Sequence, residues 1–514
     1  MISILGLVAA AMSLAAFDER TWTLARHTCW LAAATTTLAI PLATLLALLL
    51  VRTDLPGRHA ALAALGLMPW MPLYLQAAAW QSGFGLQGWL PLAWGGPVLL
   101  EGWRGAIWIH TMAAIPWAVW IIGAGLWLVR PELEEIAHLD GSAAQVLFRV
   151  TLRSALPAIG AAALWIAVTT AGEMTVSDLF AVRTYAEEMY TRLALGEELS
   201  TAGLAVLPGL AVAAWCTLAG LLVCAWLAPR QWPAGLTRRP RFRLGAWRWP
   251  ALLLVLLMVA VLVGVPLGNL VYKSGVVVRQ LGDQRLRSWS PGKGLEMVLM
   301  APWRNRRELG WSLAIGSLAA TAAVAVGLVL GGIARRGPGM AIAVLALVAV
   351  CLAVPGPMLG ASIIGLLDRA GHPLLLWLYD RSILAPVLAQ GVRCLPLATL
   401  ILWHGQQSLP RSLLENAAVD GAGPWARTGR VVLPILWPSL TIAWLTALAI
   451  AVGELAASIL VVPPGVATLS IHIFGLLHYG VEDQVAGICL AMVAFFAVIA
   501  ASVAGLGFRR CRSV

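Results

Sequence analysis

Residues 131–159 read PELEEIAHLDGSAAQVLFRVTLRSALPAI, and residues 410–440 read PRSLLENAAVDGAGPWARTGRVVLPILWPSL. In both stretches a glutamate stands six residues before a glycine, and an aspartate directly precedes that glycine. The dipeptide Arg-Val then recurs in both, followed after one residue by leucine. Farther along, the pair Gly172-Glu173 is matched by Gly453-Glu454. The chain therefore carries two copies of one unit.

Each copy predicts two short helices joined by a tight turn. A proline opens each first helix, at Pro131 and Pro410, because its fixed φ suits the first helical turn. Asp-Gly dipeptides at 140–141 and 420–421 end these helices, and glycine tolerates a left-handed cap. In the second copy Pro424 then starts a new helix. We therefore expect two equivalent helix–turn–helix elbows, with small residues that let another surface approach closely.

The rest of the chain is too apolar for water to be its main solvent. Of its 514 residues 60% are hydrophobic and 11% charged, and the mean hydropathy is +0.84. Apolar runs of about twenty residues have the length that a helix needs to cross the hydrocarbon of a bilayer. Barrel strands would alternate apolar and polar residues, which these runs do not. The runs lie near residues 1–17, 28–51, 60–80, 105–129, 158–177, 203–228, 251–272, 309–333, 340–366, 383–405, 435–461 and 485–507.

These runs predict an all-α polytopic membrane protein with about 12 transmembrane helices in two parallel six-helix repeats. The first repeat covers 1–229 and the second 251–514, and residues 1–17 are interpreted as a first span rather than a removed signal peptide. The linker, 230–250, holds six arginines and no acid, which places it in the cytoplasm. An even number of spans per repeat then puts both termini and both elbows on the cytoplasmic side. The same alternation places the segment 273–308 on the external side of the membrane. With eight basic and three acidic residues, this segment departs from the rule that basic residues gather in cytoplasmic loops.

Several function classes are disfavoured by composition and motif. The net charge of +11 is explained by arginines in cytoplasmic loops, so no nucleic-acid partner is expected. The seven cysteines form no CxxC pair and the eight histidines no HExxH motif, so neither a disulfide framework nor a metal site is predicted. The phosphate-binding pattern GxxxxGK[ST] does not occur, so no nucleotide site of this kind is predicted in this chain. No catalytic residue and no bound cofactor are predicted for this chain.

The elbows resemble the cytoplasmic EAA loop, E-A-A-x3-G-x9-I-x-L-P, of permease subunits in binding-protein-dependent ATP-binding-cassette importers. The second copy, 410–438, follows this pattern closely, whereas the first, 131–157, has Ile136 in place of the first alanine and lacks the Leu-Pro. In that family the elbow is a coupling helix that docks on the ATPase subunit. By this resemblance the coupling residues are Glu135, Ala137, Asp140, Gly141, Glu415, Ala417, Asp420, Gly421 and Pro434.

The resemblance also implies partners and a location. These are a homodimer of ATP-binding subunits, which would bind ATP and Mg²⁺ because this chain lacks the phosphate-binding pattern, an extracytoplasmic substrate-binding protein and the lipid of the cell's inner membrane. A chain that fuses both permease halves is similar to ferric-iron and thiamine permeases. Ferric iron is therefore the first substrate hypothesis, and thiamine or another small solute or oxyanion is the alternative. The rival classes are an ion-coupled secondary transporter, which should show inverted repeats and no elbows, and a membrane-embedded enzyme or scaffold.

Glu173 and Glu454 stand within apolar runs at equivalent places in the two repeats. An ionisable residue at the centre of a membrane helix costs about 2.5–3.5 kcal/mol on insertion scales, so both should face a partner or a cavity. They are either structural or gating carboxylates, which we favour, or residues that line the translocation path. Ser177 and Ser458, which follow each glutamate by four residues, could share that path, as could Asp178.

Two further features are proline pairs within spans and two histidines in the last external loop. Proline pairs at 69/72 and 355/357 interrupt corresponding spans, where either kinks or merely tolerated prolines are expected. His472 and His478 fall in the last external loop and are lesser candidates for contact with substrate.

Overall fold

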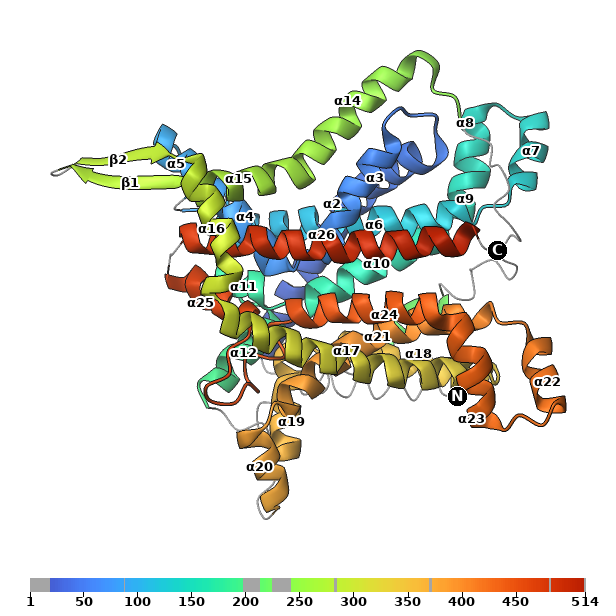
Figure 1. The fold of residues 1–514 in the computed structure, drawn as a ribbon. Helices are drawn as coiled ribbons and strands as arrows, with labels where there is room; N and C mark the ends of the chain where they lie inside the picture. The colour runs from blue at the N-terminus through green and yellow to red at the C-terminus, as the bar shows by residue number, and fades with distance from the viewer. Residues whose placement is uncertain are drawn as a thin grey trace. The chain divides into compact units, whose positions relative to one another are not determined.

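The computed structural model describes residues 19–86, 88–196, 213–223, 242–281, 284–368, 372–479 and 482–512 (Figure 1). The predicted first span, 1–17, lies outside these residues, and the predicted span 203–228 is described only as a helix over Ala213–Val223. Elsewhere long apolar helices dominate, joined by short ones and one β-hairpin. The chain is an all-α polytopic membrane protein, as predicted.

Most elements of the first half follow the predicted runs. They are α2 (Glu19–Arg52), α3 (Arg58–Leu67), η1 (Met68–Trp70), α4 (Leu73–Phe84), α5 (Trp89–Trp94), α6 (Gly102–Trp127), α7 (Pro131–Asp140), α8 (Ala143–Val146), η2 (Leu147–Thr151), α9 (Leu152–Ser154), α10 (Leu156–Ala171), α11 (Thr175–Leu179) and α12 (Tyr185–Ala194).

After the linker the chain continues through η3 (Gly245–Trp247), α14 (Arg248–Val259), η4 (Ala260–Gly264), α15 (Val265–Ser274), β1 (Val276–Leu281), β2 (Gln284–Trp289), α16 (Pro291–Arg304), α17 (Arg306–Ala334), α18 (Pro338–Ala353), α19 (Gly356–Leu367), α20 (Pro373–Arg381), α21 (Leu384–Gln407), α22 (Arg411–Val419), α23 (Pro424–Arg427), η5 (Thr428–Val432), α24 (Leu433–Gly453), α25 (Leu469–Tyr479) and α26 (Glu482–Arg512). Strands β1 and β2 pair antiparallel, with Val276 opposite Trp289. This hairpin lies in the basic segment and was not predicted.

Seven helices in the described residues are long and apolar enough to cross a membrane, or up to ten if each bent pair is one span. The predicted number of about twelve is therefore not reached within the part of the chain that the structure describes. The single spans are Glu19–Arg52, Gly102–Trp127, Gly245–Ser274, Arg306–Ala334, Leu384–Gln407, Thr428–Gly453 and Asp483–Leu506.

The proline pairs mark sharp breaks at corresponding places. The chain bends by 107° between η1 and α4, and by 103° between α18 and α19. Proline lacks an N–H and clashes with the preceding turn, so a helix ends where the pairs stand. Of the two alternatives the kinks are present, and they are full interruptions rather than gentle bends.

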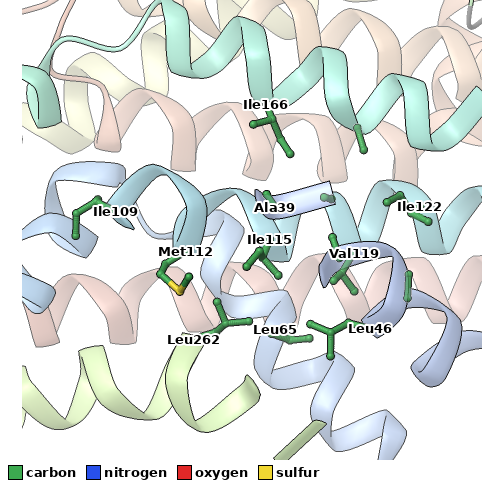
Figure 2. Packing of buried hydrophobic residues seen from close by; sticks show 14 of the residues in the cluster. Ala39, Leu46, Leu65, Ile109, Met112, Ile115, Val119, Ile122, Ile166 and Leu262 are labelled. Atoms are coloured by element: carbon green, nitrogen blue, oxygen red, sulfur yellow. The ribbon is translucent and has the colours of Figure 1, made fainter. Parts of the chain in front are cut away.

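The described chain forms two compact units. One comprises residues 1–306 with 472–496, and the other 307–471 with 497–514. In the first unit α2, α6 and α10 build the core, where Leu46, Val119 and Ile166 are among the buried side chains (Figure 2). Helix α6 packs against α2, α10 and α4, and the side chains that it leaves exposed include Trp108, Trp120 and Trp127, so this span is hydrophobic all round rather than amphipathic.

Helix α15 belongs to the first compact unit although it follows the linker. The Asn269 amide donates to the Ala79 carbonyl of α4 at 3.2 Å and accepts from the indole of Trp89 at 3.0 Å. Gly83 leaves room for it, since a Cβ there would lie 2.4 Å from the Asn269 amide nitrogen. One buried polar side chain thus fixes this helix pair, and the predicted boundaries of the sequence repeats stay a prediction.

The second unit is organised around α21 and its neighbours α24, α17 and α18. Gly327 of α17 lets the backbones approach, because a Cβ there would lie 3.1 Å from the Thr399 nitrogen of α21. Small residues at such crossings increase van der Waals contact, which drives helix association where no water is present. The unit's helices are therefore held by close backbone packing.

Candidate functional site

The first predicted elbow is present over α7, α8 and η2. Pro131 is the first residue of α7, as predicted, and Asp140 is its last. Gly141 has φ −145° and ψ 158°, so the expected left-handed cap is wrong at this position. The reason is that Ser142 starts α8 at once through a capping box with Gln145, and the chain must enter that cap extended.

The second elbow, α22 with α23 and η5, turns differently. Gly421 has φ +82°, the left-handed conformation that the sequence predicted, and its N–H donates to the Ala418 carbonyl at 3.1 Å. Pro424 begins α23, also as predicted. Pro410 caps the helix from outside instead of opening it, since α22 begins at Arg411.

Both elbows lead into a π-helical turn, and this repeat feature was not predicted. The turn η2 covers Leu147–Thr151, and η5 covers Thr428–Val432. The sequence offset between their first residues is the same as the offset between the two Gly-Glu pairs. A third π-turn, η4, lies outside the elbows, so the matched offset of η2 and η5 is what supports a shared design of the two elbows.

A buried ion pair anchors the first elbow to α2. The Arg52 guanidinium pairs with the Glu134 carboxylate, and the two side chains are 2% and 1% exposed. The other oxygen of Glu134 accepts from the Thr151 hydroxyl at 2.6 Å. Sequence reasoning assigned the neighbouring Glu135 and missed Glu134, whose partner lies 82 residues away.

The second elbow is anchored through the backbone. Leu414, directly before Glu415, takes the place that Glu134 has before Glu135, so this copy has no carboxylate at that position. Instead the Arg335 guanidinium, which directly follows α17, donates to the Leu409 carbonyl at 3.1 Å. The two elbows are thus held by different chemistry.

The predicted coupling residues are divided by exposure. Glu135, Asp140, Glu415 and Asp420 are exposed, as is Pro434 at the start of α24. Ala137, Ala417 and Gly141 are half-buried, and Gly421 is exposed. Their role in coupling stays a prediction.

A pair of exposed apolar residues was not predicted. Leu139 and Val419 stand directly before the two Asp-Gly dipeptides and are 84% and 87% exposed. Ile136 and Leu133 of α7, and Leu413 of α22, are also exposed. Apolar side chains gathered on short, otherwise polar helices are typical of surfaces that another protein covers.

The two intramembrane glutamates cap chain breaks. The Glu173 carboxylate accepts from the backbone N–H groups of Thr175 and Val176 at 2.7 and 2.9 Å, at the start of α11. The Glu454 carboxylate accepts from the Ala457 N–H at 2.8 Å, just after α24. Each glutamate therefore satisfies backbone donors that an interrupted helix leaves unpaired, which favours the structural interpretation.

In the second unit Arg393 contacts two chain breaks, the one after α24 and the one between α18 and α19. Its guanidinium lies 3.5 Å from the Glu454 carboxylate and donates to the Val354 carbonyl, at the end of α18, at 3.1 Å. In the first unit the imidazole of His110, on the corresponding helix α6, lies 3.9 Å from the Glu173 carboxylate. Each break is therefore placed beside a nitrogen-bearing side chain of the helix that precedes the elbow.

The two predicted path serines are fully buried. Ser458 accepts from the Gln390 amide at 3.1 Å. Among the described residues the Ser177 hydroxyl has no hydrogen-bond partner. In the same unit the next residue, Asp178, accepts from the His478 imidazole at 3.1 Å, and this bond raises the pKa of His478 above its ordinary 6.5.

Within the described ranges, His, Cys, Asp and Glu side chains do not gather in groups of three that could hold a metal ion. The fold and the site thus define a helical membrane protein that carries two elbows of similar design beside its spans and two carboxylate-capped chain breaks. Residues 323–509 match the family described as "Binding-protein-dependent transport system inner membrane component". This stretch of the chain is thus similar to that family, in agreement with the resemblance that the elbows carry; the match includes the second elbow and Glu454.

Curated relatives agree with this similarity. The chain is 30% identical to the putrescine transport system permease protein PotI of Escherichia coli K12 over 184 residues, which are 34% of this chain and 63% of PotI. It is 31% identical to the trehalose/maltose transport system permease protein MalF of Thermococcus litoralis over 130 residues, 25% of this chain and 44% of MalF. The chain therefore covers less than two thirds of each of these relatives.

Proposed function

We propose that this chain is the membrane-spanning permease of an ATP-driven importer, in which both elbows dock ATP-binding subunits. The family match over 323–509 and the recurrence of the elbow design in both halves of the sequence carry this proposal. A homodimer of ATPase subunits would present the same groove twice, which suits two similar elbows in one chain. An extracytoplasmic binding protein would deliver the solute, and both termini would lie in the cytoplasm.

Leu139 and Val419 would be the apolar anchors of the docking surface. Leu139 and Val419 are 84% and 87% exposed, so burying them in a partner's groove would stabilise the complex by roughly 25 cal/mol per Å² of apolar surface removed from water. The exposed Asp140 and Asp420 beside these two residues would orient the contact by charge.

The docking proposal is tested by co-purification of the tagged chain from its own membranes. An ATP-binding-cassette ATPase should accompany the unaltered chain and be lost from Leu139→Asp and Val419→Asp. Leu195→Asp is the matched control, because Leu195 is 80% exposed at the end of α12, outside both elbows. Absence of an ATPase from the unaltered chain, or equal losses in all three variants, would refute the proposal.

Uptake into cells separates the proposed importer from an ion-coupled secondary transporter. ATP depletion at constant ion gradient should stop uptake, and a protonophore at constant ATP should not. The reverse pattern would favour the secondary transporter.

The substrate of the proposed importer can be narrowed to a chemical class. Ferric iron is the first hypothesis from the sequence and thiamine the second, whereas the names of the relatives above state putrescine and trehalose/maltose. We propose a small polar solute as the substrate class, with ferric iron, thiamine, putrescine and trehalose as the compounds to compare. Uptake of each labelled compound by cells with and without the chain decides among them, and failure of all four would exclude these candidates.

A further inference from the structure

In the sequence, helix α16 stands between two membrane spans but is itself too short to be a span. The span Gly245–Ser274 precedes it through the β-hairpin, and the span that begins at Arg306 follows it. Its 14 residues reach about 21 Å at 1.5 Å per residue, less than the hydrocarbon thickness. Its position in the chain therefore confines α16 to one surface of the bilayer.

One face of α16 packs on the ends of two spans in the first compact unit. A Cβ on Gly294 would lie 3.5 Å from the Gly275 backbone, which directly follows α15. A Cβ on Gly487 of α26 would lie 2.9 Å from the Met297 carbonyl, and Figure 1 shows α16 crossing the start of α26. Close backbone contact thus holds α16 against the bundle.

An ion pair fixes this docking at the start of α16. The Lys293 ammonium lies 2.9 Å from the Asp483 carboxylate of α26 and donates to the Val276 carbonyl of β1 at 2.6 Å. Helix, hairpin and span are therefore joined at a single lysine, and α16 has a defined rotation about its axis.

With that rotation fixed, a stripe of large apolar side chains points away from the bundle. Leu295, Leu299 and Trp303 follow one another at intervals of four, so they share one face, and they are between 61% and 68% exposed. An apolar face directly beside the ends of membrane spans, with a tryptophan at its end, is typical of helices that lie in the membrane interface.

Two arginines stand where α16 ends and α17 begins: Arg304 is the last residue of α16 and Arg306 the first of α17. Arg304 pairs with Glu296 at 2.7 Å, and the Arg306 guanidinium stacks over the Trp303 ring at 5.1 Å. Both arginines are exposed, and arginine matches phosphate geometry through paired N–H donors. The charge thus lies at the edge of the apolar stripe, where lipid phosphates meet the acyl chains.

We propose that α16 is an interfacial helix that binds anionic phospholipid: Leu295, Leu299 and Trp303 enter the acyl boundary, and Arg304 with Arg306 hold the phosphate. A lipid role gives a function to the positive charge of segment 273–308, which departs from the distribution expected for an external loop. The bilayer is the occupant that the flanking spans bring to this face.

Depth in the bilayer tests the apolar stripe. The full chain, with its native cysteines replaced, is labelled with an environment-sensitive fluorophore at Leu299→Cys or at the control Ser288→Cys, exposed on the hairpin. In nanodiscs, lipids with a nitroxide near the headgroup should quench the label at 299 and spare the label at 288. Quenching of the 299 label by aqueous iodide would overturn the proposal. Protection of this label from both iodide and the lipid nitroxide, which would mean that protein covers it, would also overturn the proposal.

Lipid retention tests the two arginines. Native mass spectrometry of the chain from nanodiscs of phosphatidylcholine mixed with phosphatidylglycerol should show phosphatidylglycerol retained. Retention should fall several-fold in the double variant Arg304→Gln/Arg306→Gln and stay unchanged in Arg381→Gln, an exposed arginine of α20. Equal retention in both variants would refute the phosphate contact.

Discussion

Replacing Glu134 by alanine should release the first elbow from α2 and leave the second elbow unaffected. Arg52 and Glu134 are 2% and 1% exposed, so the variant leaves a buried guanidinium without its counterion. Breaking a buried pair in this way costs about 3–5 kcal/mol, and the Thr151 hydroxyl loses its acceptor as well. Since about 1.4 kcal/mol is a factor of ten, the detached state should become roughly a hundredfold more populated, or more.

Hydrogen–deuterium exchange of the chain in nanodiscs measures this change by segment. Amides of α7 should exchange roughly a hundredfold faster in Glu134→Ala, because exchange follows the population of the open state. Amides of α22 serve as the control within the same molecule, since Arg335 anchors that elbow through the Leu409 carbonyl.

A double variant separates lost anchoring from general damage. Arg52→Met with Glu134→Leu removes both charges and keeps apolar volume, a replacement that is often neutral or stabilising. Protection of α7 should therefore largely return. Unchanged exchange in Glu134→Ala, equal acceleration of both elbows, or a double variant as fast as the single one would refute the reasoning.

Two further predictions follow from the turn geometry and from one titrating pair. Gly421→Ala should loosen the second elbow, because a left-handed conformation costs an L-residue about 1–2 kcal/mol. Gly141→Ala carries no such backbone strain at φ −145°, and its Cβ, 3.1 Å from the Gln145 side-chain oxygen, needs only a small shift of that side chain, so its effect should be smaller. Segment-resolved exchange measures both, Gly421→Asn should be milder than Gly421→Ala, and equal effects of the two alanine variants would contradict the assignment. The hydrogen bond to Asp178 raises the pKa of His478 above 6.5, so its stabilisation is complete below that value and is lost as pH rises through the higher folded-state pKa. Thermal melting against pH should show this loss in the unaltered chain and not in His478→Gln, and identical profiles would count against it.

Much of the local structure could be predicted from the sequence, because the signals are local. Apolar runs of membrane length predicted helices such as α6 and α17, and their composition alone favours the bilayer. Proline pairs at 69/72 and 355/357 marked where a span could break, with a kink as one of two alternatives, since proline removes a donor wherever it stands. The turn at Gly421 followed from glycine's freedom at positive φ.

Other features needed contacts between distant parts of the chain. Glu134 and Glu135 are neighbours in sequence, and only the approach of Arg52 from α2 makes the first of them the anchor. Asn269 of α15 donates to the carbonyl of Ala79 in α4, 190 residues earlier in the sequence, and α15 accordingly lies in the first compact unit. Distant pairings of this kind leave no periodic signal in a single sequence.

By itself, the sequence determined the helical character and the paired elbows and marked the prolines at which spans could break, because hydrophobicity, proline and glycine act on their own neighbourhood. The tertiary structure alone decided which carboxylate is buried, how Gly141 leaves its helix and which face of α16 points outward. These depend on what each residue meets in space, since the energy of a buried charge or an exposed apolar stripe is set by its surroundings.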